Sequence, residues 1–341
     1  MMIKYGFSLK GKSHITRDTV CQDAHRIVEL ENGWMIAAIA DGVGSAVNSQ
    51  IGARIAADTV VGFCKECMPY DYSTISIKSM IRTAFNYALK KIYQQAGESH
   101  EPVESFDTTL TLVIYDGRRI IYGHSGDGAI IGLTGYGKYI EITKPQKGQD
   151  MISVVPLRAG YTQWVVDTYN EDLAAVLLVT DGMLDTISPY LLKFGEEKIY
   201  VPLAMFFSDP YCFDGETDIV EIEAFLTAED DYRIGRFYDR LEKALVKRFD
   251  DRAAKATGKH VKENNYPVTL MNKQQDDKTV VGLINTELKT ENQEAGYYDE
   301  PDWVSLQEQW NRKAYPHLYE GGYREEIAGA GLVNEVIDGI T

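Results

Sequence analysis

Residues 34–45 read WMIAAIADGVGS, an apolar run that stops abruptly at Asp41-Gly42. Such a run is long enough for a buried β-strand but far too short to span a membrane. An Asp-Gly pair is typical of a tight turn. The stretch therefore predicts a buried strand that places a carboxylate at its end.

Four further aspartates lie beside predicted strands. Asp181 follows the run AAVLLVT, Asp127 follows IIYGHSG, Asp276 lies shortly before VVGLI, and Asp23 precedes the strand Ala24–Val28. Carboxylates at rigid strand ends are the oxygen ligands that Mg²⁺ and Mn²⁺ prefer, and packed like charges need cations to neutralise them. Each Asp-Gly pair alone is more often a simple turn. Spacing by itself thus leaves a hard-cation site and ordinary turns as equal alternatives.

The remaining pattern predicts an α+β fold. Helices are expected over Ser49–Cys64, with Ser49 as the N-cap, and over Ile77–Gln94, because apolar residues recur there at helical spacing. The β-rich pieces Thr109–Tyr115, Arg119–Tyr122 and Ala129–Leu133 are joined by links too short for a parallel crossover, which predicts an antiparallel meander. Early helices followed by hairpins favour sheets stacked under helices.

We expect the chain to divide into a core domain of residues 1–285, which contains one insertion, and a C-terminal extension. A helical insertion is expected at about 186–268, with a helix near Ala228–Arg252 whose charged stretch Arg240–Arg252 we interpret as a solvated face. Residues 286–341 form a C-terminal extension that either packs on the body or docks a partner. Its large aromatic side chains are too many for an inert linker: Trp303, Trp310, Tyr315 and Tyr319.

Composition narrows the class of protein. Of the 341 residues, 44% are apolar, which indicates a folded globular chain. Lysine and arginine number 35 against 51 acidic residues, and the net charge of −16 disfavours nucleic acid and anionic membranes as main partners. Four cysteines give no secreted disulfide framework, and no leader segment is apparent, so we expect a cytoplasmic protein.

Six motifs follow one another along the chain: CQDA (Cys21–Ala24), IAAIADGVGS (Ile36–Ser45), FDTTLTLVIY (Phe106–Tyr115), YGHSGDGAI (Tyr122–Ile130), AVLLVTDGMLD (Ala175–Asp185) and DDKTVV (Asp276–Val281). Taken together and in this order, they resemble the metal-dependent PPM-type (type 2C) serine/threonine protein phosphatases, in particular bacterial members. The resemblance implies an αββα sandwich, in which two stacked antiparallel sheets are flanked by helices.

The resemblance also implies a centre of two Mn²⁺ or Mg²⁺ ions. Asp41 would bridge the two ions, and the backbone carbonyl of Gly42 would bind one of them. Asp181 and Asp276 would complete the shell of the other ion, which makes them, with Asp41, the expected catalytic residues. Asp23 would contribute directly or through water.

Other positions match the family in part. Asp127 corresponds to the aspartate that helps hold a third, weaker ion in bacterial members, and Asp150 is a minor candidate for a further ligand of it. Val43 stands where eukaryotic members carry a histidine proposed as general acid. The position of the family's phosphate-binding arginine falls on Asp18. The adjacent Arg17 is therefore assigned a minor substrate-binding role, with a plain surface residue as the equal alternative.

The activity implied is hydrolysis of phosphoserine and phosphothreonine monoesters by in-line attack of a metal-bridging hydroxide, without a phosphoenzyme. The expected partner is a phosphorylated protein, and the enzyme would oppose a serine/threonine kinase. One alternative is a pseudophosphatase or regulatory protein-binding module with the same fold. It is suggested by the aromatic extension and by two missing arginines, the phosphate-binding one and that of the family's Gly-Asp-Ser-Arg motif, where this chain has Ala129. A two-metal phosphodiesterase or nuclease is the second alternative, which the acidic charge disfavours.

Overall fold

The chain divides into two compact units, which are described separately. The larger unit comprises residues 1–189 and 199–300, and the smaller one joins residues 190–198 to the segment that starts at residue 301. All the sequence-predicted site residues except Asp150 are described and lie in the larger unit. The computed structural model describes residues 1–319 apart from 149–152, 194–197, 216, 228–231 and 250–274.

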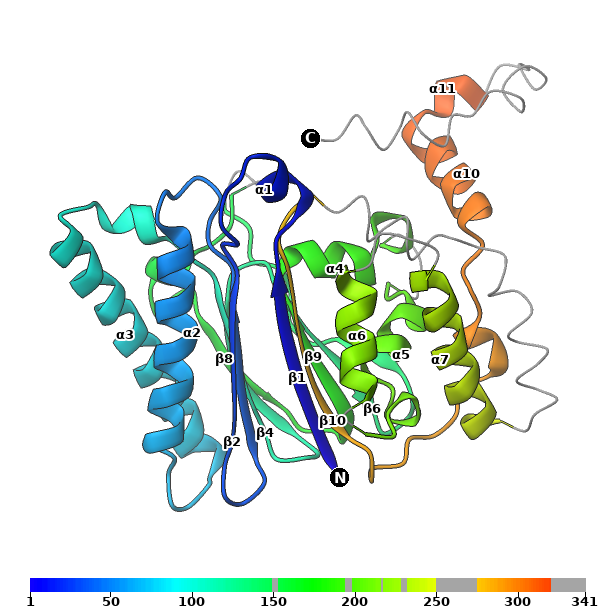
Figure 1. Cartoon of the computed structure of the whole chain (residues 1–341), viewed down its shortest axis with the longest axis horizontal. Helices are drawn as coiled ribbons and strands as arrows, with labels where there is room; N and C mark the ends of the chain where they lie inside the picture. Colours follow the sequence, from blue (N-terminus) through cyan, green and yellow to red (C-terminus); the bar gives the residue numbers. More distant parts are fainter. Residues whose placement is uncertain (149–152, 194–197, 216, 228–231, 250–274, 320–341) are drawn as a thin grey trace. The chain divides into compact units, whose positions relative to one another are not determined.

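Two antiparallel sheets form the centre of the larger unit (Figure 1). The first has the order β1 (Met2–Leu9), β10 (Lys278–Asn285), β9 (Leu173–Val179), β6 (Ala129–Thr134) and β7 (Tyr139–Glu141). The second has the order β2 (Ala24–Glu29), β3 (Met35–Ala40), β4 (Leu110–Tyr115), β5 (Ile120–Ser125) and β8 (Val165–Tyr169). The predicted α+β sandwich of antiparallel sheets is confirmed.

Strand β3 shows why the sheets stack. All of its residues are buried, and successive side chains point to opposite faces. Met35, Ala37 and Ile39 belong to the core between the sheets, whereas Ile36 and Ala38 belong to a second core beneath helices. A strand that is covered on both faces has no reason to alternate apolar with polar residues. This accounts for the uniformly apolar run at residues 34–40.

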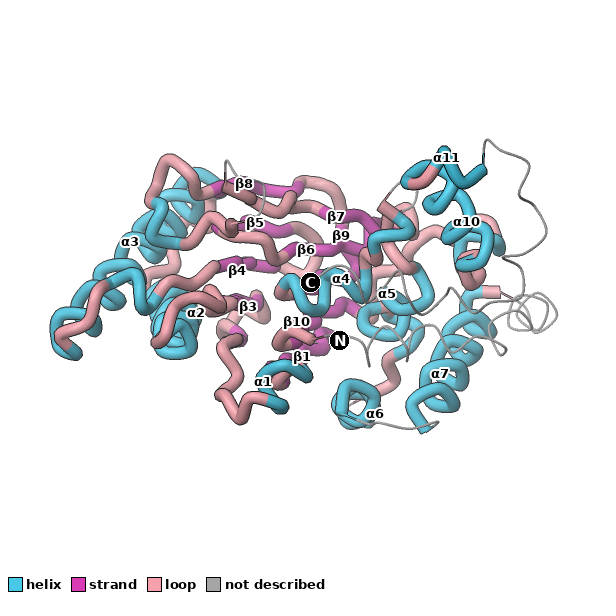
Figure 2. The backbone as a smooth tube through the Cα atoms, turned by 90° about the horizontal axis from the view of Figure 1, so that it is seen from above, coloured by secondary structure: helices cyan, strands magenta, loops and turns pink. Residues whose placement is uncertain are grey.

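Helices α2 (Ser49–Glu66) and α3 (Thr74–Ser99) cover the outer face of the second sheet, and both extend beyond their predicted ends. Figure 2 shows them on one side of the two sheets. Small residues let α2 approach its neighbours closely. A Cβ atom added at Gly52 would lie 2.0 Å from the carbonyl oxygen of Phe106, so only glycine fits at this contact.

A second group of helices covers the outer face of the first sheet, on the other side in Figure 2. The hydroxyl of Tyr5 on β1 donates a hydrogen bond of 2.6 Å to the carbonyl of Phe207, which joins the sheet to this layer. The region expected as an insertion, 186–268, supplies the last three of these helices, and its residues 194–197, 216, 228–231 and 250–268 lie outside the described residues. The helices are α4 (Asp181–Ile187), α5 (Val201–Ser208), α6 (Thr217–Thr227) and α7 (Tyr232–Arg248).

The interpretation of Arg240–Arg252 as a solvated face is wrong for its two described arginines. Arg248 is buried, donates hydrogen bonds of 2.7 and 2.9 Å to Asp209, and stacks on the ring of Tyr211. Arg240 is also buried and lies 3.3 Å from a carboxylate oxygen of Asp218. Buried charges persist when they are paired and hydrogen-bonded, and the acidic partners come from segments distant in sequence.

The predicted meander is wrong at its third strand. Strands β4 and β5 pair in the second sheet, but β6 pairs with β7 and β9 in the first. The link Gly126–Gly128 therefore crosses from one sheet to the other. A short link fixes only how far apart two strand ends lie, and a neighbouring stacked sheet is within that reach.

The smaller unit contains helices α10 (Trp303–Ala314) and α11 (Pro316–Tyr319). The ring of Trp310 contacts those of Tyr190 and Tyr315, each at a centroid distance of 5.8 Å. The division into a catalytic domain of residues 1–285 and an extension of 286–341 stays a prediction. No helix among the described residues is both long and apolar enough to cross a bilayer.

Candidate metal centre

The strand register brings distant aspartates to one end of the two sheets. Ala24 at the start of β2 pairs with Ala40 at the end of β3, which places the flanking residues Asp23 and Asp41 at the same edge. In the first sheet, Val179 at the end of β9 pairs with the starts of both β6 and β10. Aspartates that precede or follow these strand ends therefore converge.

Three of the predicted ligands form a tight cluster. Asp41, Asp127 and Asp181 each offer a carboxylate oxygen, and these oxygens all lie within 4.8 Å of one another. Asp41 follows β3, Asp127 lies in the link that crosses between the sheets, and Asp181 opens α4. The crossing of β6 into the first sheet, which the sequence did not reveal, is what carries Asp127 into the cluster.

Hydrogen bonds from two threonines fix the end of β3. Thr108 donates from its hydroxyl to the carbonyl of Asp41 at 2.8 Å. The Thr109 backbone N–H donates to the same carbonyl at 2.8 Å, while its hydroxyl accepts from the Asp41 N–H at 2.9 Å. The Thr-Thr pair of the FDTT motif therefore determines where the Asp41 carboxylate lies.

The turn after Asp41 requires glycine and corrects the predicted helix cap. A Cβ atom added at Gly42 would lie 2.7 Å from Ser49, so a larger residue would push α2 away. The N-cap of α2 is Asn48, without a side-chain cap bond, and not Ser49. The Ser49 hydroxyl instead accepts a 2.7 Å hydrogen bond from Gln22 and thereby links α2 to the CQDA motif.

Asp23 is buried beside the cluster. The hydroxyl of Thr180 donates a 2.8 Å hydrogen bond to its Oδ2 atom. Its Oδ1 atom is also buried but finds no hydrogen-bond donor among the described residues. The same is true of Oδ1 of Asp181. Buried acceptors without a donor are costly unless a cation or water satisfies them.

Asp276 and Asp277 divide two tasks. Asp277 is buried and accepts hydrogen bonds from the backbone N–H groups of Gly11 (2.7 Å) and Gln22 (2.6 Å). Nδ1 of His14 lies 2.8 Å from its Oδ1 atom. These contacts tie the N-terminal segment to the start of β10. The exposed Asp276 accepts a 2.8 Å hydrogen bond from the backbone N–H of Asp277 and is not one of the three clustered carboxylates.

Burial and repulsion between carboxylates raise the pKa of four carboxyl groups at the site, those of Asp23, Asp41, Asp181 and Asp276. Burial is the larger cause, and neighbouring carboxylates add to it. The pKa of Asp41 lies well above its ordinary value, that of Asp181 rises to about 7, and that of Asp23 rises to about 8. Partial desolvation also raises the pKa of Asp276. A divalent cation would relieve this repulsion and displace the protons.

The residues present fit hard divalent ions. They supply carboxylate oxygens only, which are the ligands that Mg²⁺ and Mn²⁺ prefer, and two of these oxygens are buried without a donor among the described residues. When no cation is bound, protonation of these carboxyl groups removes the negative charge that a cation would otherwise neutralise. The arrangement can therefore hold cations against which a phosphoryl group would bind.

Three further positions complete the comparison with the sequence. Arg17 is exposed at the C-terminal end of α1 (Lys12–Thr16), and its assigned role stays a prediction. Asp150 lies outside the described residues. Lys147 donates a hydrogen bond from its ammonium to Oδ2 of Asp127, a contact that the sequence did not predict. No motif marks Lys147, because its contact depends on how one loop folds against another.

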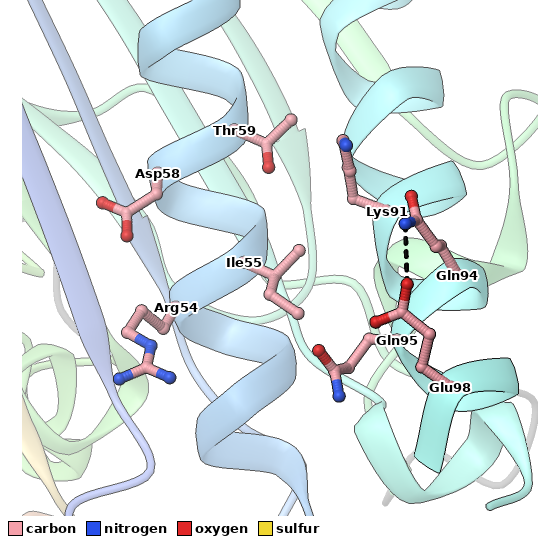
Figure 3. A pocket seen from close by; sticks show the side chains of 8 residues that line it. All are labelled: Arg54, Ile55, Asp58, Thr59, Lys91, Gln94, Gln95 and Glu98. Carbon is pink, nitrogen blue, oxygen red and sulfur yellow. Dashed lines mark hydrogen bonds between the residues drawn. The ribbon is translucent and has the colours of Figure 1, made fainter. Parts of the chain in front are cut away.

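A separate groove of about 280 Å³ lies on the surface between α2 and α3 (Figure 3). Within it, Gln94 donates a hydrogen bond of 2.8 Å to Glu98. No member of the aspartate cluster lines the groove, so it is distinct from the candidate centre. Its lining residues are Arg54, Ile55, Asp58, Thr59, Lys91, Gln94, Gln95 and Glu98.

Several solved structures are similar to this chain. A bacterial serine phosphatase carrying a point substitution aligns with a TM-score of 0.50 and 13% identity, over 86% of this chain and 100% of that one. Serine/threonine phosphatase Stp1 from Staphylococcus aureus aligns at 0.49 and 13%, over 83% and 95%. The catalytic domain of the serine/threonine protein phosphatase PstP, in complex with two manganese ions, aligns at 0.47 and 16%, over 83% and 97%.

Sequence comparison supplies the assignment. Curated protein sequences give no match. The sequence model of the family described as protein phosphatase 2C matches residues 10–204. That match covers more than half of the chain and confirms the resemblance seen in the six motifs, so this chain belongs to the protein phosphatase 2C family.

Proposed function

We propose that the protein is a metal-dependent phosphatase that hydrolyses phosphoserine and phosphothreonine monoesters in a protein substrate. The observation that carries this proposal is the convergence of Asp41, Asp127 and Asp181, whose carboxylate oxygens lie within 4.8 Å of one another. Burial raises the pKa values of Asp41 and Asp181, so packing these carboxylates together costs folding free energy. In a fold of this family, such a cluster is a candidate for catalysis rather than for stability.

Two Mn²⁺ or Mg²⁺ ions are the proposed cofactors. Asp41 and the carbonyl of Gly42 would hold one ion, and Asp41, Asp181 and Asp276 would hold the other. Asp23 would bind through its buried Oδ1 atom, directly or through water. When bound, the ions would supply an activated water and neutralise charge on the phosphoryl group.

The protein's own contribution is to fix these ligands in place. The bonds from Thr108 and Thr109 hold Asp41, the Thr180 hydroxyl orients Asp23, and the contacts of Asp277 station Asp276. Prepositioned ligands avoid the cost of reorganisation when phosphate binds. With an attacking water in line and no side-chain nucleophile required, we expect no phosphoenzyme.

A pseudophosphatase or regulatory binding module is the second candidate. Two observations favour it: Arg17 is exposed, and the ammonium of Lys147 is paired with Asp127. Neither cation is therefore assigned to binding the phosphate. For the phosphatase, the substrate would be a phosphorylated protein, modified by a serine/threonine kinase that the phosphatase opposes. A cytoplasmic location and a role in signalling belong to the same proposal.

The decisive test is Mn²⁺-dependent release of phosphate from a phosphothreonine peptide, with and without chelator, beside a phosphodiester control. Asp41→Asn and Asp181→Asn should each lower kcat by about 10³-fold or more, because each removes a ligand needed for the transition state. Asp58→Asn, an exposed carboxylate on α2, serves as the matched control and should keep wild-type turnover. Chelator-resistant hydrolysis, or near-normal rates in either site variant, would refute the proposal. Metal uptake without turnover would favour the binding module.

A further inference from the structure

A lysine ammonium lies at the edge of the aspartate cluster. Lys147 donates a hydrogen bond to Oδ2 of Asp127, whose side chain is only 8% exposed. Asp181 and Asp185 also attract its charge. Lys147 comes from the loop after β7, so its charge is delivered to the cluster from outside the strand ends that carry the aspartates.

The loop is built to hold that charge in position. Gln146 is joined to Gly126 twice: its backbone N–H donates to the Gly126 carbonyl at 2.7 Å, and its side-chain oxygen accepts from the Gly126 N–H at 3.1 Å. A backbone bridge between Lys147 and Val154 braces the other side. The residue before Lys147 is therefore tied to the residue before Asp127, which keeps ammonium and carboxylate together.

Gly126 itself is constrained by this arrangement. Its φ of 127° lies in a region that favours glycine, and an added Cβ would lie 2.4 Å from the side chain of Thr109. Thr109 in turn bonds the backbone of Asp41. A chain of contacts therefore connects Lys147, through Gln146, Gly126 and Thr109, to the end of β3.

A tethered ammonium and a divalent ion compete for the same carboxylate. Both need the oxygens of Asp127, and the ammonium adds positive charge without offering a ligand atom. Its attachment to the loop gives it a high effective concentration at this carboxylate, which a free ion has to overcome. The two ions proposed at Asp41 have other ligands and do not need Asp127.

We propose that Lys147 serves as a built-in cation at Asp127, so that this centre takes up two divalent ions and excludes a third. The inference rests on the proposed metal-dependent function and refines it. Lys147 is a positioning residue in this role: it fixes the charge and orientation of Asp127 at the edge of the centre. The third, weaker ion expected from sequence is then replaced by a side chain of the chain itself.

Titration calorimetry of the chelator-treated full chain with Mn²⁺, with the ion count checked by native mass spectrometry, tests this inference. The wild type should bind two ions. Lys147→Met keeps the length of the side chain but removes its charge, and should bind a third ion at least about tenfold more tightly than any third site in the wild type. Lys147→Arg retains the positive charge and should bind two.

Lys144→Met is the matched control, because it removes an equal charge from an exposed position of the same loop and should leave the count at two. Three ions in the wild type, or two in Lys147→Met with unchanged affinity, would overturn the inference while leaving the proposed function intact. A raised KM in Lys147→Met without a third ion would assign the lysine to substrate and likewise overturn it. A wild type that binds no Mn²⁺ would instead remove the proposed function itself.

Discussion

Replacing Asp181 by asparagine should stabilise the metal-free protein at neutral pH. The folded-state pKa of this carboxyl is raised from 3.8 to about 7, chiefly by burial and then by the Asp127 and Asp276 carboxylates. An acid with a raised pKa keeps its proton in the folded state while the unfolded chain has lost it, so stability falls as pH rises from about 4 to 7. The difference corresponds to about 4 kcal/mol at most, and we expect about 2–4 kcal/mol because the neighbouring carboxyls share protons.

Urea unfolding of the chelated wild type and of Asp181→Asn, followed by circular dichroism at several pH values, measures this effect. At pH 4 the two proteins should be nearly equally stable, and at pH 7.5 the variant should be the more stable. Comparison at each pH cancels the other titrating groups. Addition of Mn²⁺ should reverse the order, since only the wild type retains the full ligand set. A variant that is less stable than the wild type at pH 7.5 without metal would refute the repulsion on which the metal site is argued.

Three further predictions concern the framework. The pKa of buried His124 is lowered to about 4, so the wild type should lose about 3 kcal/mol as pH falls from 6.5 to 4, and His124→Gln should lose less; parallel curves would contradict this. Gly126→Ala should cost about 2–4 kcal/mol in urea unfolding, because its φ of 127° and the contact with Thr109 exclude a Cβ, whereas exposed Gly44→Ala should cost under about 1 kcal/mol; equal costs would contradict the account. Arg248→Met should cost about 3–5 kcal/mol by leaving Asp209 buried without its partner, and thermal unfolding of Arg248→Met with Asp209→Asn should recover part of the loss; no recovery would show that the pair is not the cause.

The sequence predicts the aspartates of this centre well because their strands carry a strong signal. Strands β3 and β9 are buried on both faces, so each appears as an uninterrupted apolar run that ends at a carboxylate. The end of a strand is a rigid position, so the apolar runs place both Asp41 and Asp181 at strand ends. Strands β3 and β9 belong to different sheets, however, and only the resemblance to the phosphatase family implied that the two carboxylates meet.

Other features depend on contacts that no local pattern encodes. A link of this length can join two strands of one sheet or two strands of stacked sheets. The length of the link at Asp127 therefore does not show which sheet contains β6. The pairing of Lys147 with Asp127 depends on the packing of two loops, and that of Arg248 with Asp209 joins residues far apart in the chain. On a helix with charges at regular spacing, a buried arginine and a solvated one look alike.

Anomalous diffraction at the manganese absorption edge, from crystals of the full chain soaked in Mn²⁺, tests the central claim most directly. The account predicts two strong peaks that share Asp41 as a ligand, one beside the carbonyl of Gly42 and the other beside Asp181 and Asp276. Absence of peaks at this edge of the sheets, or manganese bound only elsewhere on the surface, would contradict it.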